Sequence, residues 1–165
     1  MKKSGVSIKK ETHLEKGKLY ICTMSILEKE TRYREAVRYM SSATEILRTK
    51  ANKNGKYYED ATYVRMACGT AYSGVLLALE TYLEAKGKPI ERKRSGRTSI
   101  EDYRRRLGSL DQKILRTFNT AYEILHLVGY YEGETSYGVI RSGMDAAVDV
   151  INKIKPAGLE GLRLN

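Results

Sequence analysis

The 165-residue chain carries 30 lysines and arginines against 20 acidic residues, which gives a formal net charge of +10, and it has two cysteines and two histidines. A domain of this length buries about 70% of the surface of its unfolded chain, so it needs no disulfide or metal for stability. The cysteines form no CxxC pair, and the longest uncharged apolar run near the start, residues 19–27, is too short to cross a membrane. We therefore expect a cytoplasmic protein with no metal, cofactor or membrane contact.

Residues 1–23 are rich in lysine and show no sustained periodicity, so we expect a poorly ordered basic arm. Ser25 followed by Glu28 has the spacing of a capping box, which predicts the start of a helix. From Tyr33 to Leu47 apolar residues recur at intervals of three and four, as in a helix packed on one face. Gly55 is expected to supply the left-handed stop.

A second helix is predicted from the N-cap Asp60 to the stop signals Gly87 and Pro89. Its apolar residues cover more than one face, so it should be the most buried helix. The basic stretch that follows, residues 88–97, contains turn residues without an apolar stripe and is predicted to be a loop.

A third helix is predicted from a capping box of Thr98 and Glu101, with an interruption at Gly108 and a restart at Ser109. It should run to Gly129, and residues 129–133 should form a tight connection. The last helix is predicted from about Ser136 to Lys155. We therefore expect an all-α, up-and-down bundle of four long helices, one split near Gly108, over residues 24–156, followed by a tail at 157–165.

The excess of positive charge is concentrated in residues 1–23 and 86–106, so any electrostatic footprint for nucleic acid should lie there. Candidate phosphate-binding residues in the second segment are Arg92, Lys93, Arg94, Arg97, Arg104 and Arg105. The alternative is that these cations form an ordinary solvated surface, because clustered cations occur on many proteins without such a ligand. Both interpretations remain open at this point.

His126 is the single candidate for a general acid or base in the predicted folded body. Tyr122 and Asn119 precede it by four and seven residues, so a helix would place the three on one face. The sequence has no phosphate-binding loop, GxSxG elbow, HExxH helix or dinucleotide fingerprint. Since a lone histidine without an orienting partner is weak evidence for catalysis, we favour a structural role for His126.

Thirteen tyrosines stand against a single phenylalanine. A tyrosine keeps a polar tip that must reach water or a partner, so many of these rings should lie at helix flanks. The doublets Tyr57-Tyr58 and Tyr130-Tyr131 fall in or beside the predicted joints between helices. There the rings either stack on a base or peptide, or cover the ends of the bundle, and we favour the second interpretation.

The order of these features resembles the HEPN superfamily of helical bundles. The resemblance rests on residues 39–47, on residues 63–86 with the small-residue centre Ala71-Tyr72-Ser73-Gly74, and on residues 121–127 running into 129–133. It implies a homodimer that is either a ribonuclease or a non-catalytic module accompanying a nucleotidyltransferase or a toxin–antitoxin partner. Ribonuclease members carry an arginine that is separated from the late-helix histidine by four to six intervening residues, whereas the corresponding residues here, 119–121, are Asn, Thr and Ala.

We therefore predict a non-catalytic HEPN-like module that binds nucleic acid or a partner protein. A metal-independent ribonuclease, with His126 as general base and Asn119 as a substrate ligand, is the first alternative. A scaffold whose basic loop meets an acidic protein surface is the second.

Overall fold

The computed structural model describes residues 12–91, 98–156, 159 and 164, and it describes side chains from Ile26 onward. In this part of the chain the elements are α1 (Thr12–Thr49), β1 (Lys53–Asn54), β2 (Tyr57–Tyr58), α2 (Ala61–Ala85), α3 (Ile100–Gly108), α4 (Gln112–Ala121), the π-helix η1 (Tyr122–Glu132) and α5 (Tyr137–Lys153). The all-α prediction is confirmed. The count of four long helices is not exact, because the predicted third helix is divided into α3, α4 and η1.

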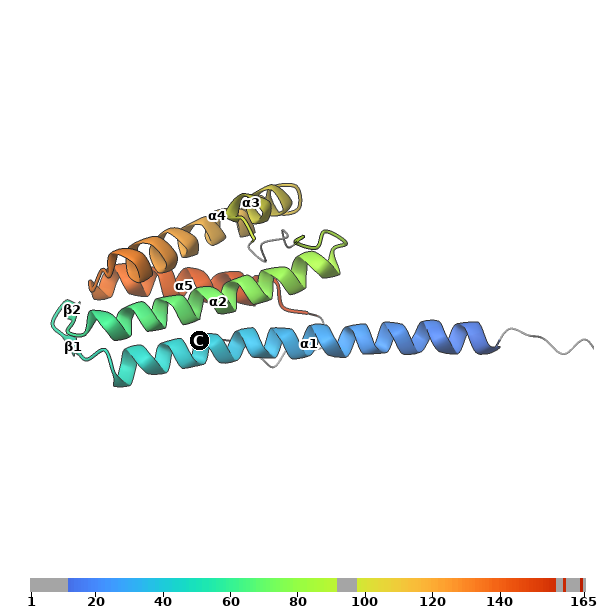
Figure 1. Ribbon diagram of the computed structural model, residues 1–165, viewed down its shortest axis with the longest axis horizontal. Helices are drawn as coiled ribbons and strands as arrows, with labels where there is room; N and C mark the ends of the chain where they lie inside the picture. Colours follow the sequence, from blue (N-terminus) through green and yellow to red (C-terminus); the bar gives the residue numbers. More distant parts are fainter. Residues whose placement is uncertain (1–11, 92–97, 157–158, 160–163, 165) are drawn as a thin grey trace, which may run out of the picture.

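Helix α1 is the longest element and extends past the ends of the other helices at its N-terminal side (Figure 1). It begins at Thr12 rather than at the predicted Ser25. The sequence pattern accounts for this, because Leu19, Cys22 and Ile26 continue a spacing of three and four before the buried stripe. Residues 1–11 of the predicted basic arm lie outside the described residues.

Helix α2 contributes more core residues than any other described helix, as the sequence predicts, and packs against α1, α5 and η1. Gly74 allows a close approach to α1, since a Cβ at this position would lie 2.9 Å from the Cβ of Tyr39 and 3.0 Å from the carbonyl oxygen of Ala36. The buried Tyr33 hydroxyl donates a 2.9 Å hydrogen bond to the carbonyl of Ile151, which joins α1 to α5. Burial raises the pKa of Tyr33 to about 12, so the phenol remains a donor.

Side-chain caps set the starts of three helices. The predicted N-cap Asp60 is confirmed, because its carboxylate accepts from the backbone N–H groups of Thr62 and Tyr63. Two other predicted starts are wrong. The cap of α3 is Ser99 rather than Thr98, and the cap of α4 is Asp111 rather than Ser109. Asp111 is the stronger cap, because an ionised carboxylate accepts two amides and also interacts favourably with the helix dipole.

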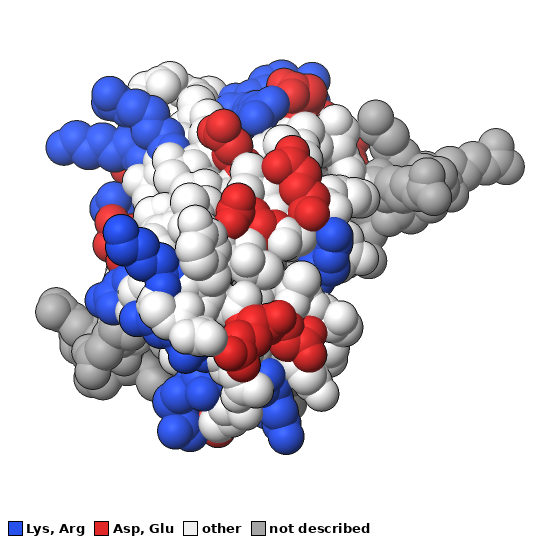
Figure 2. All heavy atoms as spheres, turned by 90° about the vertical axis from the view of Figure 1, so that its left-hand side faces the viewer, with Lys and Arg blue, Asp and Glu red and all other residues white. Residues whose placement is uncertain are grey.

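A hairpin of two-residue strands joins α1 to α2, where the sequence predicted no strand. Lys53 pairs with Tyr58 and Asn54 with Tyr57, and Gly55 adopts a φ of 58° in the turn between the strands. The hairpin also contacts the segment before α5, since Tyr58 N donates to Thr135 O at 2.8 Å. On the hairpin end of the molecule the lysines and arginines are interspersed with acidic side chains (Figure 2).

None of the helices in the described part of the chain combines the length and the apolar character that a membrane span requires. No group of three or more potential metal-binding side chains gathers among the described residues either.

Candidate functional site: an aromatic groove around His126

Helix η1 replaces both the end of the predicted third helix and the predicted tight connection at 129–133. The prediction of a stop at Gly129 is wrong, because Gly129 lies inside η1 and the chain turns only at Gly133, which has a φ of 79°. Each amide of a π-helix bonds five residues back, so side chains four and five positions apart lie above one another. The element therefore places Tyr122, His126 and the pair Tyr130-Tyr131 along one side, where their rings contact one another. Single π-helical turns occur often at functional sites.

Two glycines let η1 approach its neighbours closely. A Cβ on Gly129 would lie 2.5 Å from Cys68 Sγ on α2, and a Cβ on Gly143 of α5 would lie 2.6 Å from Ile124 Cγ2. Cys68 is fully buried at this contact, and burial raises its pKa to about 12, which leaves the thiol protonated and unreactive. The two glycines thus fix the distance at which η1 presents its rings.

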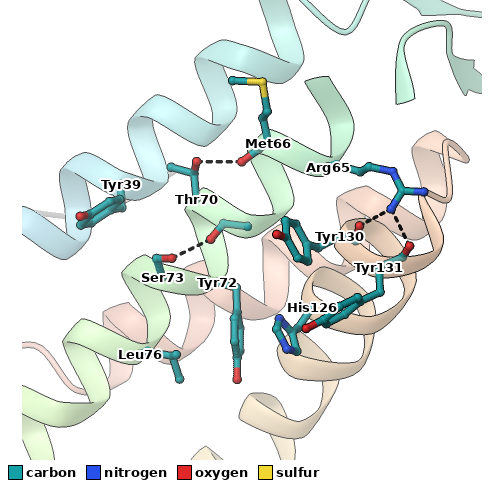
Figure 3. Close-up of a pocket in the computed structure, with 11 residues that line it drawn as sticks. Tyr39, Arg65, Met66, Thr70, Tyr72, Ser73, Leu76, His126, Tyr130 and Tyr131 are labelled. Carbon is teal, nitrogen blue, oxygen red and sulfur yellow. Dashed lines mark hydrogen bonds between the residues drawn. The ribbon is translucent and has the colours of Figure 1, made fainter. Parts of the chain in front are cut away.

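Arg65 on α2 caps the end of η1. Its Nη1 atom donates to the carbonyls of Tyr130 and Tyr131, and its Nη2 atom donates to the carbonyl of Glu132 at 3.0 Å (Figure 3). These are carbonyls that the end of a helix leaves without backbone donors. Among the described residues no carboxylate lies within ion-pair distance of Arg65, so its positive charge stays uncompensated by an acid at the edge of the site.

The rings around His126 form one cluster. The imidazole stacks on Tyr72 with centroids 4.6 Å apart and lies parallel to Tyr130 at 6.1 Å. Tyr131 meets it edge-on at 5.0 Å, and Tyr122 lies 5.4 Å away on the other side. Tyr72 belongs to α2, so the cluster joins α2 to η1.

A groove of about 610 Å³ opens beside this cluster, between α1 and η1 and over α2 (Figure 3). Its floor consists of the small residues Gly69, Thr70 and Ser73. The remaining lining residues are Tyr39, Arg65, Met66, Tyr72, Leu76, His126, Tyr130 and Tyr131. A second cavity of about 290 Å³, toward the start of α3, shares Tyr72, Leu76 and His126 with the groove. His126 thus stands in the wall between the two cavities.

His126 itself is half-buried, and burial lowers its pKa from the ordinary value of 6.5. The imidazole is therefore neutral at pH 7. Neither ring nitrogen has a hydrogen-bond partner within the described part of the chain. A general base normally needs a second group that orients it, and His126 has only stacking contacts for this purpose.

Asn119 does not contact His126. Its side-chain oxygen accepts a 3.0 Å hydrogen bond from Nε of Arg104 on α3, and the guanidinium of Arg104 lies 5.3 Å from the centre of the Tyr122 ring. Tyr122 separates this pair from His126. Arg104 also forms a 2.7 Å ion pair with Glu101, so its charge is already compensated.

The predicted cationic cluster is divided between described and undescribed residues. Arg92, Lys93, Arg94 and Arg97 lie outside the described residues. On α3, Arg104 pairs with Glu101, and Arg105 pairs with Asp102 at 2.6 Å. The structure therefore brings Tyr130, Tyr131 and His126 together and leaves Arg104 and Arg105 in ion pairs of their own.

The two tyrosine doublets have different environments. Tyr58 is 8% exposed and packs at the hairpin, whereas Tyr57 is 58% exposed. Tyr130 and Tyr131 are 43% and 62% exposed. Tyr58 therefore covers the end of the bundle, as the sequence interpretation expects. Tyr130 and Tyr131 instead present both of their rings at the groove.

Sequence reasoning missed four residues of the site, namely Tyr39, Arg65, Met66 and Tyr72. For two of them a signal was present. Tyr39 and Met66 are large apolar residues that fall outside the buried stripes of their helices, and they are 37% and 50% exposed. A large apolar residue on the polar face of an amphipathic helix indicates a surface contact.

The fold and the groove define a helical bundle with an aromatic surface site. Residues 31–156 match the family described as "Domain of unknown function (DUF5618)", and the chain belongs to that family. It is also similar to the solved structure of a protein of unknown function from Dyadobacter fermentans, with a TM-score of 0.66 and 36% sequence identity. That similarity covers 76% of this chain and 94% of the other. No curated protein matches the chain.

Proposed function

We propose that the protein is a cytoplasmic, non-catalytic binding module whose binding surface is the aromatic groove. One observation carries this proposal. Of the nine large apolar side chains that are exposed among the described residues, four line this one groove: Tyr39, Met66, Tyr130 and Tyr131. Exposed apolar groups that gather at one place on a soluble protein mark an interaction site, whereas scattered ones do not.

The chemistry of the groove favours the bases of a single-stranded nucleic acid. Exposed tyrosine rings offer stacking surfaces that accept any base. The described residues of the groove wall include the cation Arg65 and no carboxylate, so they attract a nearby phosphate without repelling it. The net charge of +10 adds long-range attraction for a polyanion.

The test compares a double tyrosine variant with a single tyrosine variant as its control. Replacing Tyr130 and Tyr131 together with alanine should weaken binding of a fluorescently labelled single-stranded RNA about tenfold or more, since each stacked base contributes about 1–3 kcal/mol. Tyr57→Ala is the matched control, because Tyr57 is equally exposed but lies on the hairpin, away from the groove. Fluorescence anisotropy at low and moderate salt gives the dissociation constants of the parent and of the two variants. Equal affinities for the parent and the double variant would exclude the groove as the RNA site.

A ribonuclease is the second candidate, and the position of Arg104 favours it. This arginine extends from α3 to Asn119, and its guanidinium lies next to the Tyr122 ring, which in turn contacts His126. A cation is therefore close to His126 although η1 and the end of α4 contain no lysine or arginine. Against it stand the ion pair between Arg104 and Glu101 and the missing orienting partner of His126. The resemblance to HEPN proteins, the homodimer and the nucleotidyltransferase or antitoxin partner belong to the proposal of a non-catalytic module and rest on the sequence alone.

His126→Ala separates the two candidates. A general base should account for a factor of about one hundred or more in the cleavage rate. We expect no cleavage by the parent and only a stability loss in the variant, because the histidine contributes stacking. RNA cleavage by the parent that disappears in a folded His126→Ala protein would overturn the non-catalytic proposal. A protein-interaction scaffold would instead bind no RNA in either form.

A further inference from the structure

A third cavity lies near the end of α2 that is far from the hairpin. Among the described residues it shares no lining residue with the aromatic groove. It has a volume of about 390 Å³ and lies where α2 and α5 end and α4 begins, beside α1. Four lysines line it: Lys29, Lys86, Lys153 and Lys155. Among the described residues the lining contains a single carboxylate, that of Asp111. We call this cavity the lysine pocket.

The charge of Asp111 is directed toward α4. Its Oδ1 atom accepts from the backbone N–H groups of Lys113 at 2.7 Å and Ile114 at 3.0 Å. The backbone hydrogen bond from Ile114 is the largest cause that lowers the pKa of Asp111, and the charges of Lys113 and Lys153 lower it further. Asp111 is therefore ionised at neutral pH, and its charge is compensated mainly by the start of the helix. Asp111 therefore does little to balance the positive charges of Lys29 and Lys86 inside the pocket.

The lysines reach the pocket from different elements. Lys29 belongs to α1, Lys86 caps α2, and Lys153 closes α5. Lys153 contacts Thr117 Oγ1 at 3.3 Å and lies 3.9 Å from a carboxylate oxygen of Asp149. Within the described part of the chain, Lys29 and Lys86 have no carboxylate within 4 Å. Most described arginines of α1 and α3, in contrast, pair with an acid three or four residues away.

Favourable interaction with helix dipoles explains the positions of only some of these lysines. Lys86 and Lys153 stand at the C-terminal ends of α2 and α5, where a cation interacts favourably with the helix dipole. Lys29 lies well inside α1, away from both ends of that helix, and still contributes to the wall of the pocket. The charge of Lys29 therefore does not serve to stabilise an end of α1.

We propose that the lysine pocket binds a compact, multiply charged anion, either free pyrophosphate or the phosphate groups of a small phosphate ester. Several ammonium groups around one concave site attract such an anion more strongly than isolated surface lysines do, because their electrostatic attractions add at one position. The hydroxyl of Tyr82, which also lines the pocket, supplies a neutral donor beside the ammonium groups. The volume suits a small phosphorylated molecule.

The experiment measures thermal unfolding and calorimetric binding with pyrophosphate, against sodium chloride of the same ionic strength. Pyrophosphate should raise the melting temperature of the parent, as any ligand specific for the folded state does. The double variant Lys29→Gln, Lys86→Gln should bind it at least tenfold more weakly. The control is Lys50→Gln with Lys56→Gln, which removes the same charge from exposed positions near the hairpin.

Three results would overturn the proposal. They are a stabilisation no larger than that of sodium chloride, an equal loss of binding in the control variant, and an unchanged affinity in the Lys29, Lys86 variant. Adenosine diphosphate forms a second arm, and tighter binding of this ester than of pyrophosphate would assign the site to a phosphate ester. The Tyr130, Tyr131 variant should bind pyrophosphate as the parent does, so this test is independent of the aromatic groove.

Discussion

The tyrosine pair of η1 and the arginines of α3 have opposite relations to their surroundings. Both stood out in the sequence as binding candidates. Arg104 and Arg105 each have an acid three residues earlier on the same helix, and the structure forms both ion pairs. Tyr130 and Tyr131 have their backbone carbonyls held by Arg65 while their rings remain exposed. A local count of charges therefore overstates what α3 offers to a ligand, and a count of aromatic residues understates what η1 offers.

The difference depends on how the two elements are held. Arg104 and Arg105 form surface ion pairs within one turn of α3, and such pairs contribute little to stability. The rings of η1 are held by close contact with α2 and α5 and by the cap from Arg65. The groove should therefore be sensitive to substitutions far from its rings, whereas α3 should tolerate substitutions of its own cations.

The largest effect is expected from Gly129→Leu. The new side chain would meet Cys68 Sγ and Cβ and the carbonyl of Ile124, so η1 must move away from α2. We expect a loss of about 3 kcal/mol or more, measured by urea unfolding. Gly138→Ala is the control, since nothing lies within 4 Å of a Cβ there, and it should leave stability unchanged or raise it by up to about 1 kcal/mol. A fully stable Gly129→Leu protein would show that the close approach does not position η1.

Arg65→Met should have the next largest effect. It removes three hydrogen bonds to the carbonyls of residues 130–132, and we expect a loss of about 1–3 kcal/mol together with weaker RNA binding. Arg105→Met is the matched substitution on α3, where the pair is exposed, and it should cost less than about 1 kcal/mol. Chemical unfolding of both variants, with anisotropy for the RNA, gives the comparison directly. Similar losses in the two variants would contradict the difference between η1 and α3.

A smaller effect is expected when Arg104 and Arg105 are both replaced with serine. Because both charges are compensated, RNA affinity should change by less than about threefold, and the dependence of affinity on salt should stay nearly the same. Replacing Arg92, Lys93, Arg94 and Arg97 with serine tests the undescribed part of the cluster separately. Loss of binding in that variant alone would place the phosphate contacts in residues 92–97, and loss in the α3 variant would show that the ion pairs open for the ligand.

Periodicity predicted the positions of the helices well, because it is a local property, whereas the structure confirms only Asp60 among the predicted capping residues. Asp60 and Gly87 mark the limits of α2 as expected, and the stripe from Tyr33 to Leu47 is buried. The π-helix could not be predicted in this way, since Gly129 has the local signature of a helix stop. What keeps it inside a helix is the contact with Cys68, which is 61 positions away in sequence. The role of Arg65 was hidden for the same reason, because its partners lie 65 to 67 residues further along the chain.

The smallest expected effect is a pH dependence of stability that comes from His126. Burial lowers its pKa in the folded state below the 6.5 of the unfolded chain. At acidic pH the unfolded state therefore binds the proton more readily, and protonation favours unfolding. Above about pH 7 the residue is neutral in both states and contributes no pH dependence. As the pH falls through 6.5 toward 5, the stability that the neutral ring provides should be lost gradually.

His126→Gln should remove this decline, because glutamine does not titrate. The parent and the variant are compared by urea unfolding between pH 5 and 8, and the difference in their free energies should be constant above pH 7 and shrink at lower pH. Asp111 does not interfere, since its lowered pKa places its titration below this window. A difference that grows as the pH falls would mean that the tyrosine rings stabilise the imidazolium by cation–π contact more than burial destabilises it. His126 would then be charged in the groove near neutral pH, and the wall shared by the two cavities would present a second cation beside Arg65 to an incoming phosphate.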